Sequence, residues 1–161
     1  IELFATLDEN ERHKMAEHLV HAPFAKGGVI TRQGAVAHWL YIIVSGEADV
    51  FWEAPGGERR LLAHLPQGSI FGEMGLMTGA PRASTVVAST DCECYRLDKN
   101  GFEEIIRARP ELAESMSHTL ALRLQQIDEL KDEYRKERSD SEKAAHRAAL
   151  VQRIRDFFGL K

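Results

Sequence analysis

The sequence predicts an α+β fold in which an antiparallel β-roll, similar to a jelly-roll barrel, is preceded by one helix and followed by others. Between residues 27 and 97, short runs rich in Val, Ile, Tyr and Trp alternate with turn residues, which is typical of many short antiparallel strands. Outside this region apolar residues recur at helical spacing. The chain has 161 residues, 43% hydrophobic and 29% charged, which suits one core with an appendage.

The N-terminal segment is expected to form one helix. Thr6 and Glu9 have the spacing of a capping box, in which each side chain bonds the other residue's backbone N–H. Apolar residues follow at roughly helical intervals. We expect a helix over residues 7–20 that ends before Pro23, because the residue before a proline disfavours helical geometry.

The central region contains six clear candidate strands separated by turn residues. Glycine, proline, serine and aspartate punctuate it at close intervals, as turns require. Cys92 and Cys94 lie two residues apart, so on a strand they share a face and are poorly placed to bond each other. The expected strands cover residues 29–30, 39–44, 48–52, 60–65, 85–89 and 94–97.

The remainder of the chain is expected to be helical. Asp98 can cap a short helix, and Pro110 suits the first turn of a long one over residues 110–137. One apolar stripe follows that long helix through Met116, Leu120, Leu124, Ile127, Leu130 and Tyr134. The polar residues 139–141 indicate a break before a short amphipathic tail helix carrying Leu150, Val151, Ile154, Phe157 and Phe158. We rank packing of this tail on its own domain first, pairing of copies second and contact with a membrane surface third.

The stretch from Phe71 to Ala88, FGEMGLMTGAPRASTVVA, carries the chemistry. Its glycines let a ligand approach backbone N–H groups closely, which suits an anion. Arg82 adds a planar guanidinium that matches a phosphate. Glu73, when ionised, only accepts hydrogen bonds and therefore suits hydroxyl or N–H donors. One anion-binding and one hydroxyl-binding side chain on a single short loop predict a sugar-phosphate site.

These residues resemble the phosphate-binding cassette of cyclic nucleotide-binding domains. The matching positions are Phe71, Gly72, Glu73, Leu76, Pro81, Arg82, Thr85 and Val86. Gly75 departs from the pattern, because the family usually has alanine there. Four further segments resemble landmarks of that family's β-roll, and we assign structural roles to them: Arg32–Gly34, Leu40–Ile43, Ser45–Glu47 and Pro66–Glu73.

The resemblance implies a binding domain over residues 1–138, with an N-terminal helix, a β-roll over 27–97 and helices over 98–138. Residues 139–161 are expected to form a separate amphipathic tail. The C-terminal helical part of the chain would then consist of a lid over the ligand, followed by this tail. The implied ligand is cAMP, favoured over cGMP because Ala83 offers no side-chain acceptor for the guanine amine. The implied ligand-binding residues are Phe71, Gly72, Glu73, Met74, Arg82, Ala83 and Ser84, with Leu120, Arg123 and Leu124 as the lid over the base.

The expected role is a sensor domain that regulates an attached effector through movement of the long helix. The motif and the ending LVQRIRDFFGL resemble the C-terminal cytoplasmic domain of bacterial cyclic nucleotide-gated channels related to the small-conductance mechanosensitive channel family. That resemblance implies an upstream membrane channel domain as partner, at the cytoplasmic face of the inner membrane, with this chain itself soluble. A homo-oligomer is left open. The alternative is a regulatory domain of a soluble signalling or transcription protein; a nucleotide-hydrolysing enzyme or a structural barrel scaffold ranks lower.

Composition excludes several other classes. A formal net charge of −4 and a pI near 6.0 do not fit a nucleic-acid binder. No apolar run reaches the ~18 residues that span a bilayer. The start at Ile1, without methionine, indicates a fragment of a longer chain. Cleavage of a cyclic phosphate usually needs metal ligands or a general base beside it, and the loop offers only Glu73, which suits the ribose better. We therefore expect no catalytic residues, no metal and no cofactor.

Overall fold

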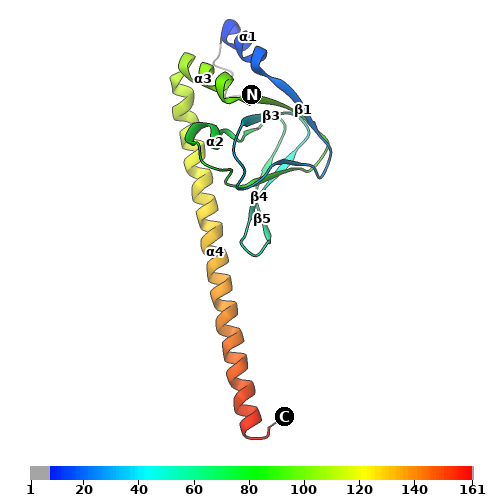
Figure 1. Cartoon of the computed structure of the whole chain (residues 1–161), viewed down its shortest axis with the longest axis vertical. Coiled ribbons are helices and arrows are strands. Elements are labelled where there is room, and N and C mark those ends of the chain that lie inside the picture. The colour runs from blue at the N-terminus through cyan, green and yellow to red at the C-terminus, as the bar shows by residue number, and fades with distance from the viewer. Residues whose placement is uncertain (1–7, 161) are drawn as a thin grey trace.

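The computed structural model describes residues 8–160, which form a β-roll with helices at one side and end (Figure 1). Two four-stranded antiparallel sheets make the roll, with strand orders β1-β8-β3-β6 and β2-β7-β4-β5. The strands are β1 (Val20–Phe24), β2 (Val29–Thr31), β3 (Trp39–Ser45), β4 (Ala48–Glu53), β5 (Arg59–Leu65), β6 (Ile70–Phe71), β7 (Thr85–Ala88) and β8 (Cys92–Asp98). The helices are α1 (Glu9–His18), α2 (Glu73–Thr78), α3 (Lys99–Ala108) and α4 (Pro110–Phe157). The predicted fold class is confirmed, although the roll is two facing sheets and not a closed barrel.

Strand β3 separates the two main parts of the core. Its side chains alternate between opposite faces of the sheet, as in any strand. Tyr41 and Ile43 point into the roll, whereas Leu40 and Ile42 pack against the helices. On the helical side they meet Phe102 and Ile105 of α3 and Leu112 and Met116 of α4. Burial on both faces of β3 therefore fixes the helices to the roll.

All six expected strands are present, and two further strands, β1 and β6, were missed. The helix expected over residues 7–20 is observed as α1, which ends earlier, at His18, because Val20 begins β1 and this strand pairs with β8. Pro23 is compatible with β1 because this strand lies at the edge of its sheet, where a missing N–H breaks no ladder. Thr6 lies outside the described residues, and the capping box uses Asp8 and Glu11 instead.

The tail differs most from expectation. No break occurs at residues 139–141, because α4 continues through them without interruption. With 48 residues it is about 70 Å long and extends well beyond the β4–β5 hairpin (Figure 1). Every side chain from Arg135 to Leu160 is exposed, so the first-ranked arrangement, packing of the tail on its own domain, is wrong. Ser139, Asp140 and Ser141 are weak helix formers, but the residues on both sides of them are mostly Arg, Lys, Glu and Ala, and no glycine or proline ends the helix there.

The two cysteines behave as predicted from their spacing. Cys92 and Cys94 are free, buried in the roll and on the same face of β8. Burial raises the pKa of the Cys94 thiol to about 11, so the thiol is inert at neutral pH.

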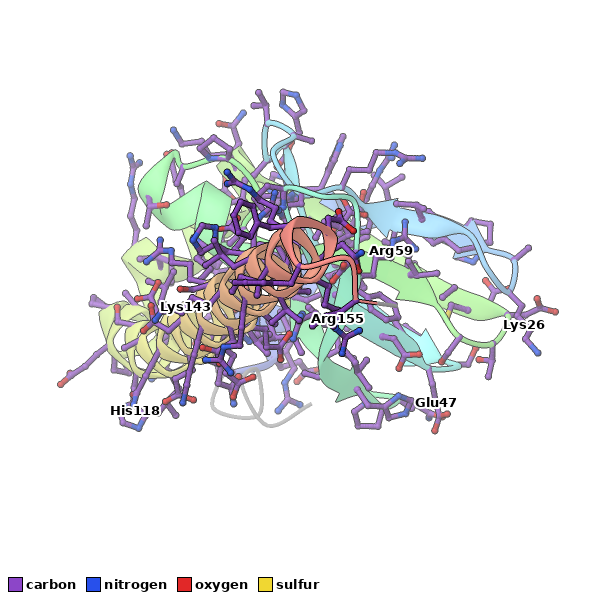
Figure 2. All side chains as sticks on the ribbon, turned by 90° about the horizontal axis from the view of Figure 1, so that it is seen from below. Lys26, Glu47, Arg59, His118, Lys143 and Arg155 are labelled. Atoms are coloured by element: carbon purple, nitrogen blue, oxygen red, sulfur yellow. The ribbon has the colours of Figure 1, made fainter. Side chains whose placement is uncertain are left out.

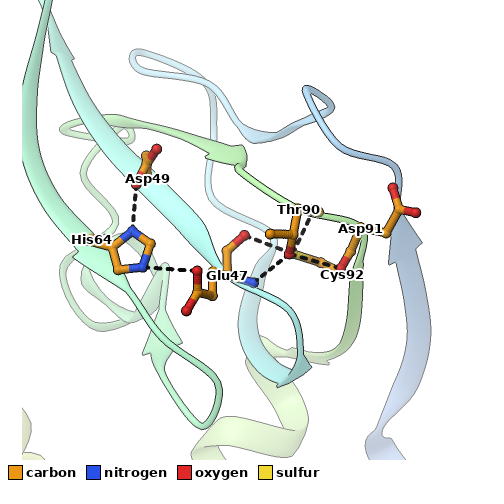
Figure 3. A network of polar contacts seen from close by, with 6 residues as sticks. All are labelled: Glu47, Asp49, His64, Thr90, Asp91 and Cys92. Atoms are coloured by element: carbon orange, nitrogen blue, oxygen red, sulfur yellow. Dashed lines mark hydrogen bonds and ion pairs between the residues drawn. The ribbon is translucent and has the colours of Figure 1, made fainter.

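A polar cluster holds the end of the roll opposite the helices (Figure 3). His64 Nδ1 lies 2.7 Å from Asp49 Oδ1, and its Nε2 lies 3.4 Å from Glu47 Oε2. The backbone N–H of Glu47 donates to Thr90 Oγ1 at 3.0 Å, which joins the cluster to the β7–β8 turn. Both imidazole nitrogens can donate only when the ring is protonated. The Asp49 hydrogen bond accordingly raises the pKa of His64.

This cluster predicts a pH-dependent contribution to stability. The pKa of His64 is higher in the folded state than its unfolded-state pKa near 6.5. The stabilisation from protonated His64 is therefore fully present below pH 6.5 and is lost as pH rises through the folded-state pKa. We expect His64→Gln to lower the free energy of unfolding at pH 6 and to have less effect at pH 8.5, measured by urea denaturation. His146→Gln, on the exposed part of α4, is the matched control. An equal effect of His64→Gln at both pH values would contradict the assignment.

Candidate functional site

The predicted loop lies where β6 turns into α2. Gly72 is the N-cap of α2 and has φ +85°, a conformation that side-chain-bearing residues rarely adopt. A Cβ on Gly72 would lie 2.4 Å from Arg82 Nη1, so glycine is required for space as well as for conformation. This turn brings the loop backbone against the guanidinium of Arg82.

Arg82 is buried at the centre of the site. Only 9% of its surface is exposed, and its Nη1 and Nη2 donate to the carbonyls of Gly72 at 2.6 Å and Trp39 at 2.5 Å. Burial lowers the pKa of Arg82, while Tyr41 and Glu73 oppose this shift. An arginine remains protonated at neutral pH even so. A guanidinium has five N–H donors, so the two carbonyls leave others for an anion.

The backbone of Arg82 is held by a second loop. Its N–H donates to Ala35 O at 2.9 Å, and its carbonyl accepts from Gly34 N–H at 2.7 Å. Gln33 anchors that loop through two hydrogen bonds with the Glu53 backbone, at 2.9 and 2.8 Å. The landmark Arg32–Gly34 therefore has the structural role that the sequence predicted.

Glu73 connects the site to α4. Its side chain is nearly buried, and Oε1 accepts a hydrogen bond from Arg123 Nη1 at 2.7 Å. Arg123 also donates to Ile70 O at 3.3 Å. The second oxygen, Glu73 Oε2, is buried and has no hydrogen-bond partner among the described residues. Buried polar atoms usually have a hydrogen-bond partner, so this oxygen is free to accept a hydrogen bond from a molecule bound in the cavity.

A cavity of about 150 Å³ lies between the roll, this loop and α4. Its polar walls are Thr31, Glu73, Arg82, Ser84, Arg123 and Gln126. Its apolar walls include Val50, Leu62, Phe71, Val86 and Ile127. Small-molecule pockets usually enclose ~300 Å³ or more, so α4 in this position leaves less room than a nucleotide-sized ligand needs.

The structure brings together most of the residues predicted from the sequence. Phe71, Gly72, Glu73, Arg82, Ala83 and Ser84 all line the cavity, as does Arg123 of the predicted lid. Leu124 does not line it, because this side chain is 46% exposed on another face of α4. The side chains of Met74 and Leu120 are outside the described residues.

Two residues that the prediction missed, Gln126 and Ile127, reach the cavity from α4. Ile127 belonged to the apolar stripe and could have been found there; Gln126 had no signal in the sequence. Ile127 packs with Trp52 and Ala54, and Tyr134 stacks edge-on against Trp52 with ring centroids 5.7 Å apart. A bidentate pair between Arg60 and Glu137 closes this contact. These contacts fix α4 along β4 and β5.

Gly75, the departure from the family pattern, occupies a crowded position. A Cβ there would lie 2.0 Å from the Cβ of Ala37. An alanine at position 75 therefore requires the loop around Ala37 to move. The glycine allows this loop to pack closely on α2.

Metal-binding clusters and membrane-spanning helices are both absent from the described residues. Within residues 8–160 no group of three His, Cys, Asp or Glu side chains is placed to hold a metal ion. Over the same range, no helix is long and apolar enough to cross a membrane.

The fold is a two-sheet β-roll, and the cavity that contains Glu73 and Arg82 lies between this roll and a long helix. Residues 22–109 match the cyclic nucleotide-binding domain, and the chain belongs to that family. It is 35% identical over 106 residues to a cAMP-dependent protein kinase regulatory subunit of Blastocladiella emersonii, covering 66% of this chain and 26% of that one. It is 39% identical over 104 residues to the corresponding subunit of Mucor circinelloides, covering 65% and 24%. The chain thus spans about a quarter of these relatives.

Solved structures agree on the fold. The catabolite activator protein of Thermus thermophilus superposes with a TM-score of 0.70 at 31% identity, over 82% of this chain and 62% of that one. The regulatory domain of Toxoplasma gondii protein kinase A with cAMP gives 0.69 at 26% identity, over 75% and 46%. The regulatory subunit of a cAMP-independent protein kinase A from Trypanosoma brucei gives 0.67 at 26%, over 73% and 43%. These relatives are protein kinase regulatory subunits and a catabolite activator protein, and they do not support the expected link to the mechanosensitive channel family.

The Glu73–Arg123 pair predicts coupled effects on stability. Arg123→Ala leaves a nearly buried carboxylate with no partner, so we expect a loss of about 1–2 kcal/mol, the lower part of the range for a buried unsatisfied group because Arg123 is partly exposed. In the double variant Arg123→Ala/Glu73→Gln the buried charge is gone, and the loss should be smaller than the sum of the single losses. Urea denaturation of the four proteins measures this. Arg135→Ala, which removes an exposed pair with Asp132, is the control expected to change little. Additive single losses would contradict the coupling.

Proposed function

We propose that this chain is a cAMP-binding sensor domain that regulates an attached effector through α4. The proposal depends on two side chains in one cavity. The buried guanidinium of Arg82 keeps free N–H donors, and the buried Oε2 of Glu73 has no hydrogen-bond donor among the described residues. The free donors of Arg82, together with the backbone of the loop, suit the cyclic phosphate. Glu73 Oε2 suits the ribose 2′-hydroxyl. Family membership and the similar regulatory domain of Toxoplasma gondii protein kinase A, which was solved with cAMP, support this choice of ligand.

Movement of α4 follows from the size of the cavity. Arg123, Gln126 and Ile127 lie across it, and a nucleotide needs more room than they leave. Binding therefore has to shift α4 or the cavity walls, and by linkage any partner that holds α4 in one position alters the affinity for the ligand. Arg123 can retain Glu73 Oε1 while the ligand occupies Oε2. In this way the helix senses whether the site is filled.

We propose a soluble signalling or transcription regulator as the larger protein, the alternative considered from the sequence. The named relatives are kinase regulatory subunits and a catabolite activator protein, which supports this choice over the membrane channel. A catalytic role has no support, since those relatives are regulatory.

Titration of the purified chain with cAMP tests the proposal directly. We expect saturable binding by calorimetry with no conversion to AMP by chromatography. Trp52 contacts Tyr134 of α4, so its fluorescence should change on binding, and Trp52→Phe should remove that change. Absence of binding would refute the sensor assignment, and turnover would refute the non-enzymatic role.

Substitution of the two charged residues should weaken binding unequally. Removing one partner of an enclosed charge pair costs roughly 2–5 kcal/mol, so Arg82→Ala should reduce affinity by about 30-fold to more than 1,000-fold. Glu73→Ala removes a hydrogen bond to a neutral hydroxyl and should cost less, about 1.5–3 kcal/mol.

Calorimetry measures both affinities, with circular dichroism as the control for folding. Arg82 also bonds two backbone carbonyls, so Arg82→Lys, which keeps the charge without the planar fork, is a second variant that should bind weakly. Near-native affinity in either Arg82 variant would contradict the phosphate assignment.

The choice of nucleotide should depend on Ala83, which lines the cavity and packs in the cluster with Trp52 and Ile127. Both nucleotides share the ribose and phosphate, so only contacts to the base discriminate. The exocyclic amine of guanine needs an acceptor when buried, and alanine has none. We expect cAMP to bind more tightly by about 1 kcal/mol or more, and Ala83→Thr to narrow the gap by strengthening cGMP. Competition titrations of the wild type and of Ala83→Thr measure the affinities for cAMP and cGMP. A wild-type preference for cGMP would indicate that side chains of α4 contact the base and discriminate between the nucleotides.

A further inference from the structure

The second half of α4 exposes apolar side chains that nothing in the described chain covers. Phe157 is 83% exposed, Phe158 67% and Ile154 56%. Helices in proteins gain most of their stability from burying one face, and this segment buries none. A partner surface is therefore required along it.

One exposed face runs the length of the helix. Positions three and four residues apart share a helical face. This face lies about a third of a turn from the face that contacts the roll through Arg123, Ile127 and Tyr134, at 3.6 residues per turn. Figure 2 shows His118 and Lys143 on the side of α4 away from the strands. The exposed face consists of His118, Leu122, Gln125, Glu129, Glu133, Lys136, Asp140, Lys143, Arg147, Val151, Ile154 and Phe158, all of them exposed.

The charges on this face are complementary to themselves when the direction is reversed. In an antiparallel pair of helices centred on position 138, Lys136 faces Asp140 of the second copy. In the same register, Glu133 faces Lys143 and Glu129 faces Arg147. Twofold symmetry makes each of these pairs twice.

The apolar side chains match in the same register. Leu122, which is 51% exposed, falls opposite Ile154, and His118 falls opposite Phe158. Among the described residues none of these six charged side chains forms an ion pair, and Glu129 accepts a weak hydrogen bond from Gln125 at 3.4 Å. Glu133 also lies near Arg60 of β5, where it adds to the rise in the Arg60 pKa that Glu137 mainly causes. The charges of the other residues are thus available to a second copy.

We propose that this face of α4 binds a second copy of the chain in antiparallel orientation. A parallel pair in register would place each charge opposite itself, Glu129 beside Glu129 and Arg147 beside Arg147, which is repulsive. A membrane surface would use only the last turns, from Val151 to Phe158, and would leave the charge match unexplained. The roll contacts α4 mainly through another face, which carries Ile127, Tyr134 and Glu137.

Charge reversal tests the interface. Sedimentation velocity of the full chain should show a dimer that weakens with added salt. Arg147→Glu and Glu129→Arg should each weaken dimerisation by about tenfold or more, because each places like charges together twice. The double variant should restore the dimer. Arg153→Glu makes the same charge change on another face and is the control expected to leave the dimer intact.

Cross-linking tests the orientation. Leu122→Cys and Ile154→Cys place thiols at exposed positions, while the native Cys92 and Cys94 are buried. Under mild oxidation a mixture of the two variants should form the 122–154 disulfide, and each variant alone should form little. A monomer at all concentrations, a dimer indifferent to charge reversal, or 122–122 cross-links would each overturn the proposal. Monomeric chain that sediments with phosphatidylserine vesicles would assign the face to a membrane instead.

Discussion

The site depends on one buried cation. Arg82 is almost fully removed from water, and a charge in that position is tolerated only when its donors are satisfied. The carbonyls of Trp39 and Gly72 supply two partners from β3 and from the turn before α2. The left-handed turn at Gly72 places a carbonyl against that guanidinium, and the second loop, at Gly34 and Ala35, holds the backbone of Arg82. The cavity is the space that remains in front of it.

Glu73 extends this arrangement to the long helix. One carboxylate oxygen is taken by Arg123 and the other is left bare, so a single buried side chain faces both α4 and the cavity. The contacts of Ile127, Tyr134 and Glu137 with β4 and β5 add to that link. The part of α4 that is fixed to the site therefore continues without a break into the exposed part of the same helix.

Family membership constrains the site more than it constrains the output. The matched relatives include kinase regulatory subunits and a catabolite activator protein, and the chain covers only part of each. One similar structure belongs to a cAMP-independent kinase regulator, so a shared fold does not by itself establish the response to cAMP. The free donors of Arg82 and the unpaired oxygen of Glu73 are the features of this chain that argue for a nucleotide.

The sequence by itself determined the fold class, six strands, the loop that carries Glu73 and Arg82, and the starts of α3 and α4, because turn residues, caps and a dense motif are local signals. It misplaced Val20, because an edge strand that tolerates Pro23 has no local signature. Gln126 and the solvent orientation of Leu124 were decided by how α4 packs on the roll, since the stripe alone leaves the angle of the helix undefined within a few tens of degrees. The exposure of the apolar end of α4 was also decided by tertiary structure, because no surface of the roll extends far enough to cover it. The unbroken helix through residues 139–141 is a local outcome, since no glycine or proline interrupts it.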